Sequence, residues 1–273
     1  MSDYLRARKL ELAKPNDYLM VNRFYTAVEG EGITIGQPKW FLRFQGCSVG
    51  CKWCDSKETW KFEGFEIADF SVEKHAMFKI DETHLDDMIT YMRSVNKNIH
   101  HISITGGEPL QQNMILLKKL VEKLVKHSFK VQIETSGQTT PTPEAKEILE
   151  MITYHGGLVS VDFKTPSSGV KPNLDMIAEC LKQWNSSRWV AVQLKAVVAD
   201  MTDYEATKEA YNNLMRKWPK AEYIITPCWE PGKERKLGPE WFKMFMDDKE
   251  WYSMPKVIMQ QHKSIFGTDD LDS

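Results

Sequence analysis

The sequence has little net charge and no long apolar run. Its 36 basic and 38 acidic residues give a formal net charge of −2, so no strong overall field attracts nucleic acid or an anionic membrane. No run approaches the roughly eighteen uncharged apolar residues of a membrane span, and the first residues lack an apolar signal segment. We therefore expect a cytoplasmic protein with no nucleic-acid or membrane partner.

Cysteines are also few, and their distribution is uneven. There are five in 273 residues, an odd number, and three of them lie between Cys47 and Cys54. A secreted disulfide framework would be small and rich in cysteine, so the sequence favours a reducing compartment and a metal. No repeat or low-complexity tract divides the chain. We predict one domain over residues 1–273, with a short N-terminal extension and an irregular insertion near residues 61–80.

Outside that insertion, segments with strand character alternate with segments of helical spacing. Strands are expected at 18–28, 39–44, 99–105, 129–135, 157–163, 189–198 and 221–228, and helices near 85–95, 117–125, 142–152, 174–181, 204–218 and 241. Alternation of this kind predicts an α/β fold with a parallel sheet, either open or curled into a full or partial barrel. In both cases functional residues gather at the carboxyl ends of the strands.

The segment GCSVGCKWCDS places Cys47, Cys51 and Cys54 in one loop, separated by three and then two residues. Thiolates at such spacing bind zinc or an iron–sulfur cluster. Structural zinc normally takes four protein ligands, and neither a second CxxC pair nor a nearby histidine follows. The missing fourth ligand favours an open coordination position, although zinc and three buried, unligated thiols remain alternatives.

The pair CxxxCxxC and TGGEP, the latter at residues 105–109, resembles the two signatures of radical S-adenosylmethionine enzymes. The resemblance implies a barrel of that type, with the three cysteines binding three irons of a [4Fe–4S] cluster. S-adenosylmethionine would chelate the fourth iron. Gly106 and Gly107 would let the backbone approach the methionine end of that cofactor, and Glu108 would lie beside them.

A narrower resemblance covers most of the chain and is to the 7-carboxy-7-deazaguanine synthase family. The motifs that carry it occur in order: FYTAVEGEG, GQPKWFLRFQGC, CKWCDSKETW, ITGGEPL, VQIETSG, VDFKTPSSG and QQHKSIFG. The family commonly reads LQGEG where this chain has VEGEG. The resemblance implies a lyase that contracts the ring of 6-carboxy-5,6,7,8-tetrahydropterin to 7-carboxy-7-deazaguanine with loss of ammonia, in queuosine-type biosynthesis. It also implies a homodimer and a one-electron donor such as flavodoxin.

Position by position, the resemblance assigns several residues to S-adenosylmethionine. They lie in the cysteine loop and at the ends of successive strands, where hydroxyl, carboxylate and ammonium groups can bind the ribose and the methionine carboxylate. These residues are Trp53, Cys54, Asp55, Gly106, Gly107, Glu108, Glu134, Ser136, Asp162, Phe163, Lys164, Thr226, Pro227, Cys228 and Trp229. The alternative for the charged pairs among them is a buried ion pair or a cap.

The substrate would be bound by residues of matching chemistry. Glu31 can accept two hydrogen bonds from a pterin amino group and ring N–H, and Arg43 can form a bidentate pair with a carboxylate. Thr105 and His262 complete the expected catalytic set. Ser56, directly after Asp55, matches the hydroxyl that the family uses for Mg²⁺, which often keeps several waters and few protein ligands. Its alternative is a helix N-cap.

Two other functions remain open at the level of sequence. One is a different radical S-adenosylmethionine enzyme, such as a glycyl-radical activase, which would share the cysteine and TGGEP motifs but not EGEG, Arg43 or QQHK. The other is a non-catalytic zinc-binding module. Product analysis separates the first, and metal content separates the second.

Overall fold

The computed structural model describes residues 17–60, 66–67, 77–183, 190–228, 238–261 and 263. Their strands form one ten-stranded sheet in the order β10-β9-β8-β7-β6-β5-β2-β1-β4-β3. From β2 to β10 every neighbouring pair is parallel, whereas β1 runs antiparallel to both β2 and β4. The two ends of this order do not pair, so the described sheet is an open, partial barrel.

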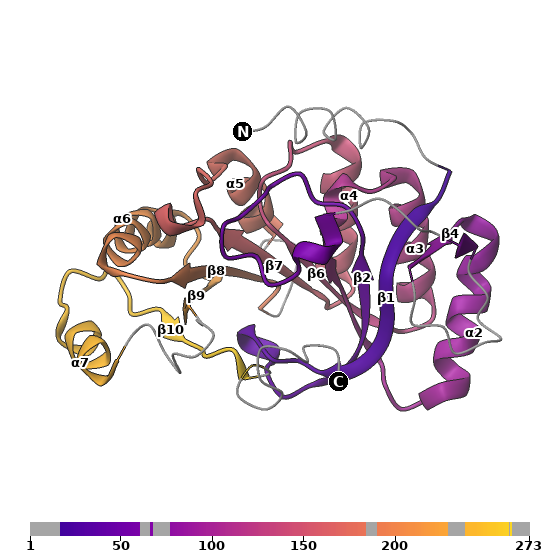
Figure 1. Cartoon of the computed structure of the whole chain (residues 1–273), viewed down its shortest axis with the longest axis horizontal. Helices are drawn as coiled ribbons and strands as arrows, with labels where there is room; N and C mark the ends of the chain where they lie inside the picture. The colour runs from indigo at the N-terminus through magenta and orange to yellow at the C-terminus, as the bar shows by residue number, and fades with distance from the viewer. Residues whose placement is uncertain are drawn as a thin grey trace.

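The strands follow the expected alternation with helices. They are β1 (Leu19–Val28), β2 (Pro38–Phe44), β3 (Glu66–Ile67), β4 (Phe78–Ile80), β5 (His101–Gly106), β6 (Lys130–Thr135), β7 (Leu158–Phe163), β8 (Val192–Val198), β9 (Glu222–Pro227) and β10 (Lys256–Val257). The α-helices are α2 (Leu85–Asn96), α3 (Met114–Lys126), α4 (Pro143–Tyr154), α5 (Leu174–Lys182), α6 (Met201–Lys217) and α7 (Pro239–Asp247). In Figure 1 helices α2 to α6 form an arc around the outside of the sheet.

Local sequence explains where the helices begin. The Asn113 side chain accepts a hydrogen bond from the Leu116 amide at the start of α3, and Thr142 does the same for Ala145 at the start of α4. Pro143 occupies the first helical position, where it has no hydrogen bond to lose. The buried residues of α3 recur at three- and four-residue spacing and pack on the sheet.

The two faces of the parallel strands differ in chemistry. On the outer face, residues such as Leu42, Ile104 and Val161 join the hydrophobic core beneath the helices. The inner face of the same strands carries polar side chains, which are Lys39, Arg43, Ser103, Thr105, Gln132, Glu134, Ser160, Asp162, Gln193 and Lys195. The fold therefore supports a polar interior on an apolar shell.

The expected irregular insertion ends earlier than predicted. Within it, residues 61–65 and 68–76 lie outside the described residues, but Glu66–Ile67 pairs with Phe78–Ile80, which in turn pairs with β1. Phe78 and Ile80 are buried while Lys79 between them is not. Buried and exposed side chains thus alternate with the two-residue period of a strand. In the sequence, neighbouring aromatic and charged residues mask this period.

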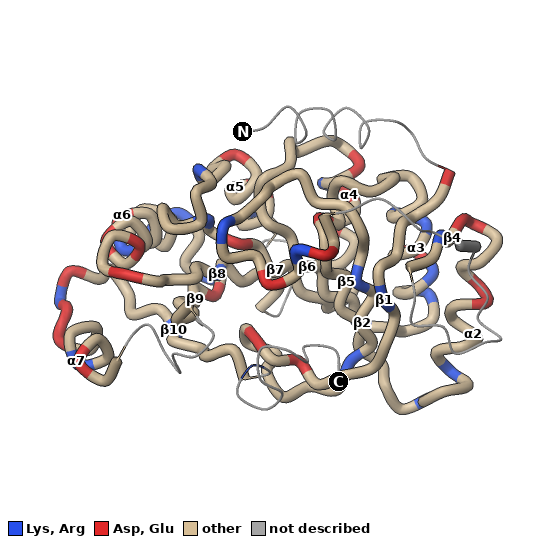
Figure 2. Tube along the Cα trace, in the orientation of Figure 1, with Lys and Arg blue, Asp and Glu red and all other residues tan. Residues whose placement is uncertain are grey.

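After β10 the chain crosses the open side of the sheet. The Ile258 amide bonds to the Ile225 carbonyl, and the Gln261 amide bonds to the Gly30 carbonyl. Residues 258–261 therefore link the β9 edge to the loop after β1, which turns inward beneath them. Acidic and basic positions are interspersed over the described elements (Figure 2). No helix in these ranges is long and apolar enough to span a membrane.

Candidate active site

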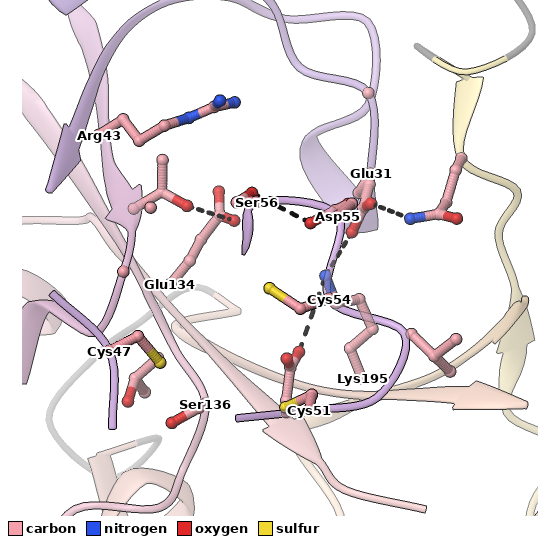
Figure 3. Close-up of a pocket in the computed structure, with 18 of the residues that line it drawn as sticks. Glu31, Arg43, Cys47, Cys51, Cys54, Asp55, Ser56, Glu134, Ser136 and Lys195 are labelled. Atoms are coloured by element: carbon pink, nitrogen blue, oxygen red, sulfur yellow. Dashed lines mark hydrogen bonds and ion pairs between the residues drawn. The ribbon is translucent and has the colours of Figure 1, made fainter. Parts of the chain in front are cut away.

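A cavity of about 240 Å³ opens among the loops that follow the parallel strands. It collects residues from segments far apart in the sequence, including the loop after β1, the cysteine loop and the ends of β5, β6 and β7 (Figure 3). The sequence-predicted residues that line it are Glu31, Arg43, Cys47, Cys51, Trp53, Cys54, Asp55, Ser56, Thr105, Gly106, Gly107, Glu134, Ser136, Asp162, Lys164 and Cys228.

Four other predicted cofactor contacts do not line this cavity. Phe163 lies in the core against Tyr211, and Thr226 and Pro227 are buried at the end of β9. The fully buried Glu108 lies behind the wall of the cavity. Two further predictions, Trp229 and His262, fall outside the described residues.

Glu108 has a structural task instead. Its carboxylate accepts hydrogen bonds from the Leu110 amide at 3.0 Å, the Thr135 hydroxyl at 2.8 Å and both the amide and hydroxyl of Ser136. Burial raises the pKa of Glu108. The side chain thus joins the end of β5 to the end of β6 and fixes the cavity-lining Ser136. TGGEP spacing alone does not show in which direction this carboxylate points.

The cysteine loop is closed at its base by hydrogen bonds. The Gly46 amide bonds to the Thr59 carbonyl at 2.7 Å, and Gln45 Nε2 bonds to the Glu58 carbonyl at 2.8 Å. Farther along, the Lys52 amide bonds to the Ser168 carbonyl, which ties the loop to the segment after β7. These contacts hold the three cysteines at the carboxyl end of β2.

The donor set of this loop fits an iron–sulfur cluster. Cys47, Cys51 and Cys54 form no disulfide, and all three line the same cavity. Burial raises the pKa of Cys47 to about 12 and that of Cys54 to about 11, so the thiolates need a compensating positive charge such as bound iron. Within the described residues no three His, Cys, Asp or Glu side chains are arranged to hold a single metal ion.

The two glycines of TGGEP are required by the packing of one strand end on another. A Cβ on Gly107 would lie 2.2 Å from the Gly46 carbonyl oxygen, and a Cβ on Gly106, whose φ is +96°, would lie 2.6 Å from the Phe44 amide nitrogen. The Gly107 amide also bonds to the Phe44 carbonyl. The close approach is thus between β5 and the start of the cysteine loop, a reason additional to the cofactor contact that the resemblance implies.

Glu31 is held on one wall of the cavity by two residues that the sequence analysis did not identify. Lys195 Nζ, from β8, contacts one carboxylate oxygen, and Gln260 Nε2 donates to the other at 2.6 Å (Figure 3). Lys195 follows the same inward alternation as Gln193, which is the only signal in the sequence that could have revealed it. Gln260 begins the QQHK motif, but its partner could not be inferred from spacing.

Arg43 lies on the opposite wall, at the end of β2. Its guanidinium donates to the Tyr25 hydroxyl at 3.2 Å and approaches Glu58 at 3.5 Å. Tyr25 and Phe41 stack beside it, with ring centroids 5.4 Å apart. A planar cation next to an aromatic wall is suited to a flat molecule that bears a carboxylate. Thr105, on β5, donates to Glu134 on β6 at 3.1 Å.

Asp162 and Lys164 form an ion pair at 2.7 Å between the cysteine loop and β8. Burial opposes both charges, but Lys164 and Lys195 together hold the pKa of Asp162 below its usual value, and Asp162 and Cys51 raise that of Lys164. The Lys164 ammonium lies 5.3 Å from the centroid of the Trp53 ring. The pair is therefore the buried ion pair of the alternative interpretation, and it also lines the cavity.

Asp55 and Ser56 lie at the rim. The Ser56 hydroxyl donates to Asp55 Oδ1 at 3.1 Å, and Lys263 Nζ approaches Asp55 Oδ2 at 3.4 Å. Burial would raise the pKa of Asp55, but the Lys263 charge and the Ser56 hydrogen bond lower it. The described contact of the Ser56 side chain is with a neighbouring carboxylate, an oxygen-only pair of the kind that Mg²⁺ prefers.

A second buried network lies deeper, beneath Glu134. Glu29 bonds to Lys39 Nζ at 2.9 Å and accepts from Gln132 Nε2 at 3.0 Å, and Gln132 also donates to Glu134. Burial, reinforced by the charge of Glu134 and opposed by Lys39, raises the pKa of Glu29 to about 7. Glu29 stands where the LQGEG pattern has glutamine, and the sequence analysis assigned it no role.

Comparison with protein families shows the class to which the chain belongs. Residues 28–177, more than half of the chain, match the model of the 4Fe-4S single cluster domain family. The chain belongs to this family.

The curated relatives are more specific. Two proteins named 7-carboxy-7-deazaguanine synthase, from Buchnera aphidicola and Escherichia coli K12, are 36% and 38% identical over 44% and 43% of this chain. The chain spans about half the length of these relatives, 55% and 52% respectively. A third protein of the same name, from Methanopyrus kandleri, is 27% identical over 84% of this chain and 87% of its own length. The predicted family resemblance is confirmed.

The fold also matches a solved structure. The crystal structure of QueE from Escherichia coli superposes with a TM-score of 0.61, covering 90% of this chain and 95% of that one at 24% identity. The predicted fold class is confirmed, in its partial rather than its full form.

Proposed function

We propose that this protein is a 7-carboxy-7-deazaguanine synthase, which contracts the ring of 6-carboxy-5,6,7,8-tetrahydropterin and releases ammonia. The observation that carries the proposal is the single cavity in which the three loop cysteines lie with Glu31 and Arg43. The cavity thus contains thiolates that could hold a cluster. It also contains a carboxylate and a guanidinium group, on opposite walls, that could bind a pterin carboxylic acid. The three curated relatives compared above bear the same name.

The roles proposed for individual residues are those that the family resemblance implies. Cys47, Cys51 and Cys54 would hold the [4Fe–4S] cluster, and Asp162 and Lys164 would bind the ribose hydroxyls and the methionine carboxylate of S-adenosylmethionine. When bound, these groups supply one-electron cleavage of a carbon–sulfur bond and hydrogen abstraction from the substrate. Arg43 would bind the substrate carboxylate, and Glu31 would accept from its donor-rich heterocycle edge. The walls align the substrate and exclude water.

Magnesium belongs to the same proposal. Ser56 lies at the rim with its hydroxyl on Asp55, where it could bind Mg²⁺ together with substrate oxygens and waters. A homodimer, a donor such as flavodoxin, a cytoplasmic location and a place in queuosine-type biosynthesis complete the proposal as predictions that follow from the family resemblance.

The proposal is tested with anaerobically reconstituted protein, S-adenosylmethionine and carboxytetrahydropterin, with the product identified by mass spectrometry. We expect 7-carboxy-7-deazaguanine and ammonia. Arg43→Ala and Glu31→Ala should retain the cluster but lose ring contraction and substrate affinity. Retained substrate affinity in both variants would contradict their assignment, and transfer of hydrogen from a protein partner without pterin turnover would favour an activase.

A further inference from the structure

Lys195 lies between Glu31, which is expected to bind the substrate, and Asp162, which is expected to bind the cofactor. Its ammonium contacts Glu31 on one side and lies 3.7 Å from Asp162 Oδ1 on the other. The side chain is only 11% exposed, compared with 18% for Glu31 and 23% for Asp162. One cation is thus shared by two carboxylates from different segments of the chain.

The contacts continue in both directions from Lys195. Beyond Glu31, Gln260 donates to the second carboxylate oxygen at 2.6 Å. Beyond Asp162, Lys164 contacts the other oxygen at 2.7 Å and lies over the Trp53 ring. The chain of contacts therefore runs from the residue expected to bind the heterocycle to residues beside the cysteine loop.

This arrangement links two binding events. A heterocycle that donates hydrogen bonds to Glu31 competes with Lys195 for its oxygens, which leaves more of the ammonium's attraction for Asp162. Because the Lys195 side chain is largely buried, such a redistribution of charge is weakly screened. The position of Asp162, and hence the binding of the cofactor, then depends on whether Glu31 has bound the heterocycle.

We propose that Lys195 is a positioning residue that couples pterin binding to S-adenosylmethionine binding. The inference rests on the proposed function, because it takes the ligands of Glu31 and Asp162 from it. Binding of either ligand should strengthen binding of the other by the same factor, since coupling free energies are reciprocal.

The test measures the Kd of S-adenosylmethionine with and without carboxytetrahydropterin, on reconstituted protein kept anaerobic. In the wild type we expect the pterin to tighten cofactor binding by about fivefold or more, the lower range of typical couplings. In Lys195→Met the ratio should fall to about one, with the cluster absorbance retained. Lys195→Arg, which keeps the charge, should recover part of the coupling.

Lys208→Met is the matched control. Lys208 is also 11% exposed and bridges the acidic residues Asp248 and Glu250, but it lies on α6 and does not line the cavity. Its loss should lower the Tm and leave the coupling unchanged. Should Lys195→Met fail to fold, Lys195→Gln removes the same charge while keeping a group that can bond to both carboxylates.

The outcomes separate the two claims. Product formation by the wild type, together with full coupling in Lys195→Met or Lys195→Gln, would overturn this inference alone. A wild type that neither binds the pterin nor forms product would overturn the proposed function. Coupling lost in the Lys195 variants but retained in Lys208→Met supports the inference.

Discussion

The carboxylates that line the cavity differ in how their surroundings shift their pKa. Asp162 lies between two lysines, whereas Glu29 has one lysine and a neighbouring carboxylate beneath the site. Its pKa of about 7 exceeds the 4.5 of an ordinary glutamate, so the folded state binds this proton more tightly than the unfolded state does. Glu29 therefore contributes stability that is complete below about pH 4.5 and is lost as the pH rises through about 7.

Glu29→Gln should remove this pH dependence. The Tm of the variant minus that of the wild type should increase by several degrees from pH 5 to pH 8. This increase corresponds to a relative gain of at most about 3 kcal/mol in the free energy of unfolding of the variant. Thermal melts at half-unit pH intervals provide the measurement. A Tm difference that stays constant over this range would show that Glu29 does not titrate with a raised pKa.

The three loop cysteines should be necessary for the cluster, and the other two should not. Cys180 is fully buried in α5, and Cys228 lies at the end of β9 on the cavity wall. Alanine at any of positions 47, 51 or 54 should abolish the visible absorbance of the reconstituted cluster. Cys180→Ala and Cys228→Ala should retain it and lose about 1 kcal/mol of stability. A dispensable loop cysteine, or an essential Cys180 or Cys228, would contradict the assignment.

Ser56→Ala should shift the magnesium dependence of turnover to higher concentration, because it removes the one proposed protein ligand. The initial rate against Mg²⁺ concentration is compared with that of Ser48→Ala, a serine in the same loop whose hydroxyl accepts from Gln111. Identical magnesium curves for Ser56→Ala and the wild type would leave the serine as a structural residue. A cap would lower stability by about 1 kcal/mol without changing the response to metal.

At the scale of elements, the alternating strands and helices could be predicted from the sequence, but the segments that cross the open side of the sheet could not. The strands and helices of the parallel run have clear two- and four-residue periods, so their existence could be predicted. Strand β10 and the crossing at 258–261 have no period, because two residues and a few backbone hydrogen bonds define them. Gln260 was missed for the same reason, since it reaches Glu31 only when this crossing closes over the loop after β1. Lys195 follows the inward alternation of β8, but its pairing with Glu31 could not be inferred from spacing.

The packing of β5 against the start of the cysteine loop depends on the absence of a Cβ atom at Gly107. Gly107→Ala should push β5 away from Gly46, because its Cβ would lie 2.2 Å from a carbonyl oxygen. We expect a Tm lower by several degrees and faster loss of the cluster to a chelator. Gly238→Ala is the control, since nothing in the part of the chain that the structure describes lies within 4 Å of its added Cβ, and it should behave like the wild type. Equal Tm values for the two variants would contradict the packing argument.

For the whole molecule, an α/β partial barrel and most of its cavity lining could be predicted because one principle governs both. Parallel strands with helices on one face bring their carboxyl ends together, so motifs at successive strand ends meet. Which side chains turn into the cavity is decided by packing, as Glu108 and Phe163 illustrate by turning away from it. The buried Glu29–Lys39–Gln132 network could not be predicted, because it depends on the loop after β1 entering the barrel.

The most direct test of the account is the number of product molecules formed per molecule of S-adenosylmethionine, by reconstituted wild-type protein with excess carboxytetrahydropterin. The account predicts several molecules of 7-carboxy-7-deazaguanine for each cofactor, with one ammonia per product and little accumulated 5′-deoxyadenosine. Cofactor cleaved without deazaguanine, or a colourless protein that retains one zinc ion and forms no product, would contradict it.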